Sequence, residues 1–206
     1  MFAPDVLERV QERQRAIVSL LRAIGNHNLA DRDILEIGCG TGANLLEFLA
    51  LGADPGRLVG NDLLADRLNG ARRVLPGSVQ LIEGNASSLN IADCSFDIVY
   101  QSTVFSSIQD SALQTSLAIS MWRWVKPGGG VLWYDFVYNN PSNQDVSGVP
   151  LRRVRVLFPE GKMTVRRITL APPIARWVTA FHPWLYPVFN AIPFLRTHIL
   201  CWIQKQ

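Results

Sequence analysis

Short apolar runs alternate with amphipathic stretches along most of the sequence, and this alternation restricts the chain to few architectures. Strands are predicted at 33–37, 58–61, 79–83, 96–100 and 130–136, and helices at 43–51, 65–74 and 110–125. The segment Lys-Pro-Gly-Gly-Gly at 126–130 is predicted as a turn between the last of these helices and the last of these strands. Neighbouring parallel strands have to be joined by a crossover, which is usually a helix. The pattern therefore predicts an α/β fold, with a doubly wound, mainly parallel sheet and helices on both faces.

The rest of the chain adds elements to the same domain. A helix is predicted at 5–24, another at 151–158, and strands at 163–170 and 197–203. Residues 171–196 form an apolar insertion before the last strand, and its five prolines would break a membrane-spanning helix. Short helices that cover a pocket or lie on a bilayer surface fit it better. Residues 1–206 are thus predicted to form one domain: an N-terminal helix (1–30), a core (31–137), the rest of the sheet (138–170 and 197–206) and a lid insertion (171–196).

Three glycines stand within five positions directly after the first predicted strand, in the segment ILEIGCGTGANLLEFL. Gly38, Gly40 and Gly42 would let the backbone bend sharply and approach a ligand, with the N–H groups of the next helix directed toward it. The segment also satisfies the G-x-G-x-x-G/A pattern of dinucleotide-binding folds, so by itself it is a weak signal. A bare turn without a ligand is the alternative.

Polar residues stand at the ends of the following strands as well. Glu36 precedes the glycines, Asp62 closes the second strand, Asn85 follows the third, and Gln101 ends the fourth. In a doubly wound sheet these ends meet where ligands bind. Glu36 could accept hydrogen bonds from an amine, and Asp62 could bind ribose hydroxyls. The side-chain amide of Asn85 could form hydrogen bonds with the edge of an adenine ring. Each also has a structural alternative: a helix cap for Asp62, a turn residue for Asn85 and a satisfied strand end for Gln101.

Taken together, the segments ILEIGCGTG, VGNDLL, EGNASSL, SFDIVYQSTVFSSI, WVKPGGGVLWYDF and LRTHILCWI resemble those of class I S-adenosylmethionine-dependent methyltransferases, of the small-molecule type (type 11-like). The resemblance covers about residues 30 to 137 and the last strand. It implies a Rossmann-like sheet of seven strands whose last strand is antiparallel, and S-adenosylmethionine as the cofactor.

The resemblance also implies roles for individual residues. The loop of Gly38, Cys39, Gly40 and Gly42 would pass under the methionine part of the cofactor, and Glu36 would hold its amino group. The remaining positions would contact the ribose, the adenine and the region near the sulfonium: Asp62, Leu63, Asn85, Ala86 and Gln101. Many family members carry Asp where this chain has Asn85, which keeps the acceptor oxygen.

Methyl transfer from a sulfonium is an in-line displacement, and it needs a general base only if the acceptor must lose a proton. Asp135, at the end of the fifth strand, and His182, in the insertion, are the predicted catalytic residues. A structural hydrogen bond for Asp135 and a hinge position for His182 are the alternatives. Further polar candidates at the strand ends are Ser102, Thr103, Tyr134, Tyr138, Asn139 and Asn140.

Charge is distributed unevenly and suggests the kind of acceptor. Residues 1–150 carry 11 Lys/Arg and 16 Asp/Glu, whereas residues 151–206 carry 9 Lys/Arg and Glu160 as their one acid. Trp177, Phe181 and Trp184 belong to six aromatic residues of the insertion that could form an apolar wall; the others are Tyr186, Phe189 and Phe194. Basic and aromatic residues together favour an anionic or lipid-linked small molecule, such as a phosphate-bearing glycan precursor or a lipid intermediate, and a peripheral membrane contact through 171–196. A solvated basic face and core packing of the aromatics are the alternatives.

Other functions remain open at this point. The fourth strand lacks the Asn-Pro-Pro-aromatic signature of enzymes that methylate nucleic-acid bases, so DNA is not expected as a partner, and an RNA methyltransferase ranks lower. An NAD(P)-dependent oxidoreductase and a non-catalytic binding module with this fold are further alternatives. The three cysteines, Cys39, Cys94 and Cys201, lack metal-ligand spacing and are expected to be reduced, buried thiols of a cytoplasmic protein.

Overall fold

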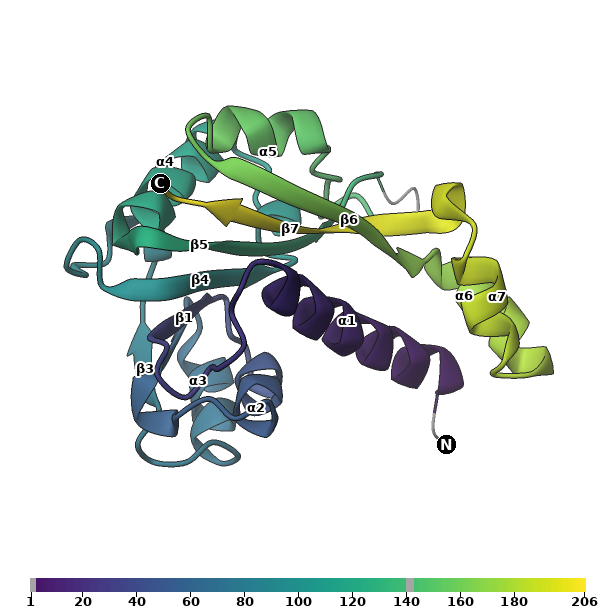
Figure 1. Cartoon of the computed structure of the whole chain (residues 1–206), viewed down its shortest axis with the longest axis horizontal. Coiled ribbons are helices and arrows are strands. Elements are labelled where there is room, and N and C mark those ends of the chain that lie inside the picture. The colour runs from purple at the N-terminus through teal and green to yellow at the C-terminus, as the bar shows by residue number, and fades with distance from the viewer. Residues whose placement is uncertain (1–2, 140–142) are drawn as a thin grey trace.

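The computed structural model describes residues 3–139 and 143–206, and this part of the chain contains a seven-stranded sheet (Figure 1). The strand order is β3-β2-β1-β4-β5-β7-β6. Strands β1 to β5 run parallel, and β7 runs antiparallel to both β5 and β6. The predicted seven-stranded sheet with an antiparallel last strand is therefore confirmed. The bounds are β1 Ile34–Ile37, β2 Leu58–Asp62, β3 Gln80–Glu83, β4 Phe96–Ser102, β5 Val125–Phe136, β6 Lys162–Leu170 and β7 Arg196–Gln204.

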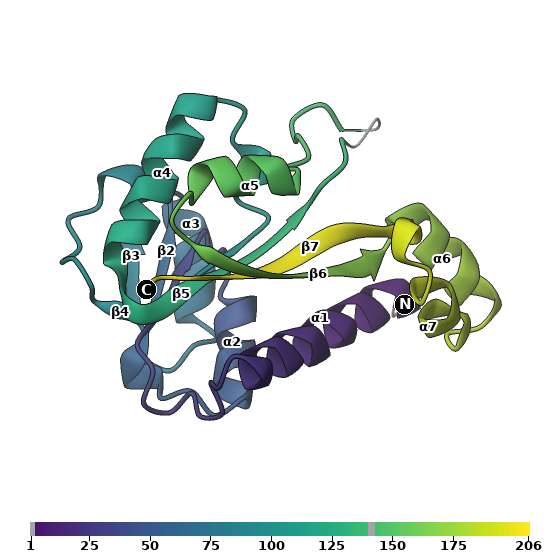
Figure 2. The same cartoon turned by 45° about the horizontal axis from the view of Figure 1, so that its top comes forward.

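Helices cover both faces of the sheet, as the alternation predicts. Figure 2 shows α4 and α5 on one side and α1 and α2 on the other. Apolar side chains of α1, α2 and α3 share a core with Ile34 and Leu132, whereas those of α4 and α5 pack against Leu35 and Trp133. Because neighbouring strand residues point to opposite faces, a sheet covered twice needs nearly continuous apolar strands. The helices are α1 Pro4–Ala23, α2 Ala43–Ala50, α3 Ala65–Arg72, α4 Ser111–Trp124 and α5 Leu151–Leu157.

The segment Lys-Pro-Gly-Gly-Gly at 126–130 is predicted as a turn, and this prediction is wrong because β5 runs through it from Val125. A Cβ atom on Gly129 would stand 2.6 Å from the backbone oxygen of Asp97, and one on Gly130 would stand 2.6 Å from the ring of Trp202. These glycines are therefore needed for close contact between β5 and its neighbours rather than for chain reversal.

The insertion consists of short helices, as its prolines predict. They are α6 Pro172–Phe181, α7 Leu185–Asn190 and the 3₁₀ turn η4 Pro193–Leu195. Among residues 3–139 and 143–206, no helix has both the length and the apolar character that crossing a bilayer requires. The insertion leaves the carboxyl end of β6 and returns at the amino end of β7. Since β7 is antiparallel, the insertion lies at the edge of the sheet where β1 to β5 also end, which we call the carboxyl edge.

A single carboxylate holds the insertion to the N-terminal helix. Glu12 of α1 accepts hydrogen bonds from the Thr169 backbone N–H at 3.0 Å, the Tyr186 hydroxyl at 2.7 Å and the Asn190 amide at 2.6 Å. Both views place α6 and α7 beside the amino-terminal part of α1 (Figures 1 and 2). We refer to these four residues as the Glu12 clasp. Asn140, one of the polar candidates, lies outside the described residues.

Candidate functional site

The loop at 38–42, between β1 and α2, has a backbone that only glycine adopts easily. Gly38, Gly40 and Gly42 have φ angles of +67°, +56° and +87°, in the left-handed region that penalises a Cβ atom. A Cβ on Gly38 would stand 2.5 Å from Val104, and one on Gly42 would stand 2.8 Å from Leu75, but one on Gly40 would meet nothing within 4 Å. Protein atoms therefore exclude side chains at Gly38 and Gly42, and only Gly40 borders open space where a ligand could lie.

Gly38→Ala is expected to lower the free energy of unfolding by about 2–4 kcal/mol, because left-handed strain adds to the contact with Val104. Gly77→Ala is the matched control, since its Cβ meets nothing within 4 Å and its φ is ordinary. Urea denaturation of the two variants measures the difference. Equal stability of the two would contradict this account of the loop.

Glu36 is fully buried at the centre of the carboxyl edge, directly before the loop. Its Oε1 accepts a hydrogen bond from the Asn44 amide at 2.6 Å, while Oε2 has no partner among the described residues. Burial raises the pKa of this carboxyl to about 8, against the lowering effect of Asn44. A buried carboxylate oxygen without a partner is unfavourable unless a donor arrives. Glu36 therefore fits the predicted role of receiving a cationic group.

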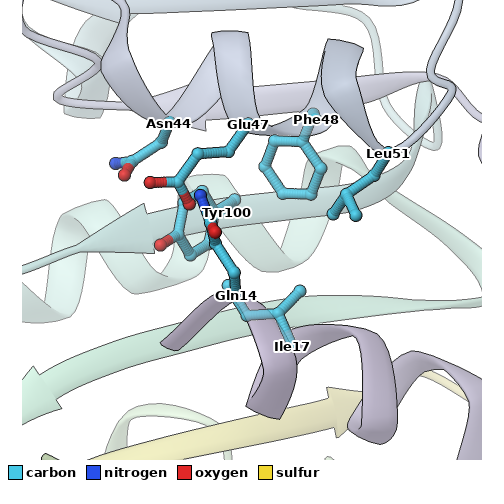
Figure 3. Close-up of a pocket in the computed structure, with 7 residues that line it drawn as sticks. All are labelled: Gln14, Ile17, Asn44, Glu47, Phe48, Leu51 and Tyr100. Carbon is cyan, nitrogen blue, oxygen red and sulfur yellow. The ribbon is translucent and has the colours of Figure 1, made fainter. Parts of the chain in front are cut away.

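Tyr100, Arg13 and Glu47 complete the surroundings of Glu36, and none of them was predicted. Tyr100 is the cross-strand neighbour of Glu36, and its buried hydroxyl also lacks a partner in the described structure. Arg13 of α1 pairs with Glu47 of α2 at 2.7 Å and lies 5.5 Å from the centre of the Tyr134 ring. Figure 3 shows Glu47 and Tyr100 between the two helices. A cavity of about 10 Å³ lies there, lined by Gln14, Ile17, Asn44, Glu47, Phe48, Leu51 and Tyr100.

Asp62, at the end of β2, is buried and holds the loop in place. One carboxylate oxygen accepts the Gly40 N–H at 2.8 Å, and the other accepts the Leu64 N–H at 3.0 Å. Leu63 is 65% exposed beside it, which leaves its side chain free to cover a flat ring. The structure thus brings Glu36, the glycine loop and Asp62 together at neighbouring strand ends, as predicted.

Asn85 and Ala86 follow β3 at the same edge. The Asn85 oxygen accepts the Ser87 N–H at 3.0 Å and begins the 3₁₀ turn η2 Ala86–Ser88. The amide of Asn61, another residue that sequence reasoning missed, donates to the backbone oxygens of Ile82 and Gly84, both at 3.0 Å. These contacts fix the loop after β3 relative to Asp62. Asn85 therefore acts as a turn residue, which was its structural alternative. Recognition of adenine by Asn85 stays a prediction.

Gln101 and Asp135 lie on the opposite face of the sheet from Glu36. Gln101 is fully buried, donates to the backbone oxygen of Tyr134 at 3.3 Å and accepts the Val104 N–H at 3.0 Å. Asp135 is fully buried too, and its carboxylate accepts the N–H groups of Ser106 and Phe136 at 3.1 and 2.9 Å. Burial raises the pKa of Asp135 to about 6. Backbone groups therefore already engage both side chains.

Asp135→Ala is expected to lower the free energy of unfolding by about 1–3 kcal/mol, because the buried Ser106 N–H would lose its acceptor. Affinity for the predicted cofactor should change less than about twofold, since the Asp135 carboxylate bonds to the N–H groups of Ser106 and Phe136 and not to Glu36, the glycine loop or Asp62. Chemical denaturation and calorimetry on one preparation measure both quantities. An Asp135→Asn enzyme with normal stability and little turnover would instead support the predicted catalytic role.

The two histidines of the carboxyl edge differ sharply in environment. His182 is exposed in the turn between α6 and α7, and its Nδ1 accepts the Trp184 N–H at 3.2 Å. His198, which sequence reasoning missed, is 9% exposed at the start of β7 and stacks on Tyr134 with ring centres 4.9 Å apart. Burial, together with Arg9 and Arg13, lowers the pKa of His198 to about 4, so its ring is neutral at pH 7.

The expectation of three buried, reduced cysteines is only partly correct. All three are free thiols, and Cys39 and Cys201 are buried, but Cys94 is exposed in the loop before β4. The Cys39 side chain packs in the core beneath Gly60, and burial raises the pKa of its thiol to about 12. Only the backbone of Cys39 is therefore available to a ligand at the loop.

Comparison with known proteins agrees with this geometry. Residues 34–129 match a family model described as a methyltransferase domain. The chain is 28% identical to trans-aconitate 2-methyltransferase of Afipia carboxidovorans over 95% of its own length and 71% of that protein. It is 33% identical to a ubiquinone/menaquinone biosynthesis C-methyltransferase of Vibrio parahaemolyticus, but over 50% of its own length and 40% of that protein.

A solved structure resembles the whole fold. Geranyl diphosphate C-methyltransferase from Streptomyces coelicolor, in complex with Mg²⁺, geranyl diphosphate and S-adenosyl-L-homocysteine, superposes with a TM-score of 0.66 at 13% sequence identity. The match covers 92% of this chain and 77% of that one. At this identity, the likeness shows the fold alone.

Proposed function

We infer that this chain, whose residues 34–129 belong to a methyltransferase-domain family within the class I fold, is an S-adenosylmethionine-dependent methyltransferase of small molecules. The observation that supports this most is the unpartnered Oε2 of Glu36 beside a left-handed glycine loop that Asp62 holds. The free chain keeps a proton on this buried carboxyl at pH 7, and an arriving amine would favour its ionised form. The family resemblance assigns ribose binding to Asp62.

The bound cofactor would supply an electrophilic methyl group, so the work of the protein is to align the acceptor and exclude water. In this proposal Glu36 and the loop orient the amino-acid end of the cofactor, and Asp62, Leu63, Asn85 and Ala86 orient its nucleoside end. Asp135 and His182 stay the predicted proton acceptors. Asp135 would have to give up the hydrogen bond from Ser106, whereas His182 would have to approach from an exposed turn.

The finer part of the proposal concerns the acceptor, which we expect to be anionic or lipid-linked. No Asp or Glu occurs after Glu160, whereas six Lys/Arg do. Similar proteins carry names that point to trans-aconitate and geranyl diphosphate, which are anions, and to a membrane quinone. We expect a cytoplasmic protein that contacts the membrane peripherally through 171–196, with this insertion acting as a lid over the acceptor.

Calorimetry and thermal shift test the proposal directly. S-adenosylhomocysteine at about 100 times its dissociation constant should stabilise the fold by roughly 2.7 kcal/mol, and NAD(P) should not. Stabilisation by NAD(P) alone would indicate an oxidoreductase, and salt-sensitive binding of RNA an RNA methyltransferase. Absence of any heat with S-adenosylhomocysteine would overturn the proposal.

A further inference from the structure

Large apolar side chains are gathered on the outer side of the insertion, where no part of the described structure covers them. Five such residues are between 59% and 78% exposed: Trp177, Phe181, Trp184, Val188 and Phe194. The ring of Trp177 lies 5.2 Å from that of Phe181 and 6.5 Å from that of Phe189, so α6 and α7 present their aromatic side chains together. Single exposed apolar residues are ordinary, but a gathering of this kind marks an interaction site.

The exposure does not result from poor packing of the insertion. Its inner side forms a small core in which Ala175, Val178 and Tyr186 pack against Leu170. In the Glu12 clasp, Tyr186 and Asn190 of the insertion donate hydrogen bonds to Glu12 of α1, which also accepts the N–H of Thr169 in β6. The insertion is therefore held from within, and its two sides have different chemistry, which is typical of a helix pair that lies at an interface.

Charge indicates what the outer side meets. The insertion itself, residues 171–196, contains Arg176 and Arg196 and no Asp or Glu. Arg176, the neighbour of Trp177 in α6, is exposed and has no ion pair among the described residues. Tryptophan together with arginine suits the interface of a membrane, where the rings enter the headgroup layer and the guanidinium groups face the phosphates. An anionic surface complements this part of the chain.

We propose that the outer side of the insertion docks on an anionic phospholipid bilayer, with Trp177, Phe181, Trp184, Val188 and Phe194 entering the headgroup layer. The insertion lies at the carboxyl edge, so docking brings the edge that carries Glu36 and Asp62 toward the membrane. A lipid-linked acceptor would then meet the protein where that acceptor resides. In this respect the inference rests on the proposed function, although the docking itself needs no cofactor.

Intrinsic fluorescence tests the docking, because the exposed tryptophans are confined to this surface. Trp177 is 59% and Trp184 78% exposed, whereas Trp122 on α4 is partly buried and Trp124, Trp133 and Trp202 are at most 2% exposed. Vesicles of phosphatidylglycerol and phosphatidylcholine should shift the emission of the full chain to the blue and sediment it. Binding should fall by about tenfold with phosphatidylcholine alone, and at 1 M salt, where charges are screened beyond about 3 Å.

Matched variants separate this surface from apolar exposure in general. Trp184→Ser combined with Phe194→Ser should abolish sedimentation with the anionic vesicles. Ile119→Ser is the control, because Ile119 is 62% exposed on α4, on the opposite side of the sheet. Equal binding of both variants would overturn the proposal. So would self-association without vesicles that the double variant removes, because that would make the surface an interface between copies of the chain.

Binding of S-adenosylhomocysteine is measured in parallel, without vesicles. All three proteins should bind it alike, because the substituted residues lie outside the glycine loop and its neighbours. A chain that sediments with vesicles but binds no S-adenosylhomocysteine would refute the proposed function and leave the docking intact. A chain that binds S-adenosylhomocysteine but no vesicles would refute the docking alone.

Discussion

Glu36→Gln is expected to weaken binding of S-adenosylhomocysteine by roughly 10- to 100-fold, the effect of removing one charge-assisted hydrogen bond. The same variant should fold at pH 7 at least as stably as the natural chain, because it no longer buries an ionisable carboxyl without a full set of partners. Calorimetry and urea denaturation measure the two effects. Glu160→Gln is the control, since Glu160 is exposed and distant in sequence from the site.

The pH dependence of this variant adds a second readout. Burial raises the pKa of Glu36 from 4.5 to about 8, so the folded chain keeps a proton that the unfolded chain has lost. Between these two values, Glu36 makes the free energy of unfolding fall as pH rises. A cationic ligand favours the ionised form, so binding should release a proton and strengthen with pH up to about 8. Glu36→Gln should remove this contribution, and persistence of proton release in the variant would contradict the role of Glu36.

Asp62→Ala is expected to have the largest combined effect, on both the fold and the affinity for the cofactor. It removes the acceptor of the Gly40 and Leu64 N–H groups, and each hydrogen bond to a charged group is worth about 1.5–3 kcal/mol. The free energy of unfolding should fall by about 2–4 kcal/mol. Affinity for S-adenosylhomocysteine should fall by more than about 100-fold. The variant would lose the bond that holds Gly40 of the loop, and it would lose the carboxylate that is predicted to accept hydrogen bonds from the ribose hydroxyls.

Asp54→Ala is the matched control for that experiment. Asp54 also accepts a backbone N–H two residues further on, from Gly56 at 2.8 Å, but it stands exposed at the start of a 3₁₀ turn. Loss of this cap should lower the free energy of unfolding by about 1 kcal/mol and leave binding unchanged. If Asp62→Ala behaved in the same way, Asp62 would be a structural cap and no part of the cofactor site.

The fold was largely predictable because its determinants are local. Apolar runs between turn residues predicted the strands, and parallel strands must end at one edge, which placed Glu36, Asp62 and Asn85 together. Lys126 to Gly130 misled the prediction, because glycines that permit a turn also permit close approach of strands. Only the long-range neighbours Asp97 and Trp202 decide between these two possibilities.

The missed residues depend on how α1 packs against the sheet. Arg13 meets Glu47 across 34 positions of the sequence, and the one signal in the sequence is that both are charged residues on amphipathic helices. Tyr100 could have been found from strand register, since it lies opposite Glu36. The sequence could not show which of His182 and His198 is the better candidate for a site residue. His182 is exposed in a turn and His198 is buried beside Tyr134, and both environments follow from tertiary contacts.

The placement of Glu12 and Arg13 on one turn of α1 has a mechanical consequence. Glu12 accepts hydrogen bonds from Tyr186 and Asn190 of the insertion. Arg13 forms an ion pair with Glu47 of α2, the helix that begins directly after the glycine loop. Because adjacent residues of α1 make these two sets of contacts, a displacement of this helix would change both sets at once.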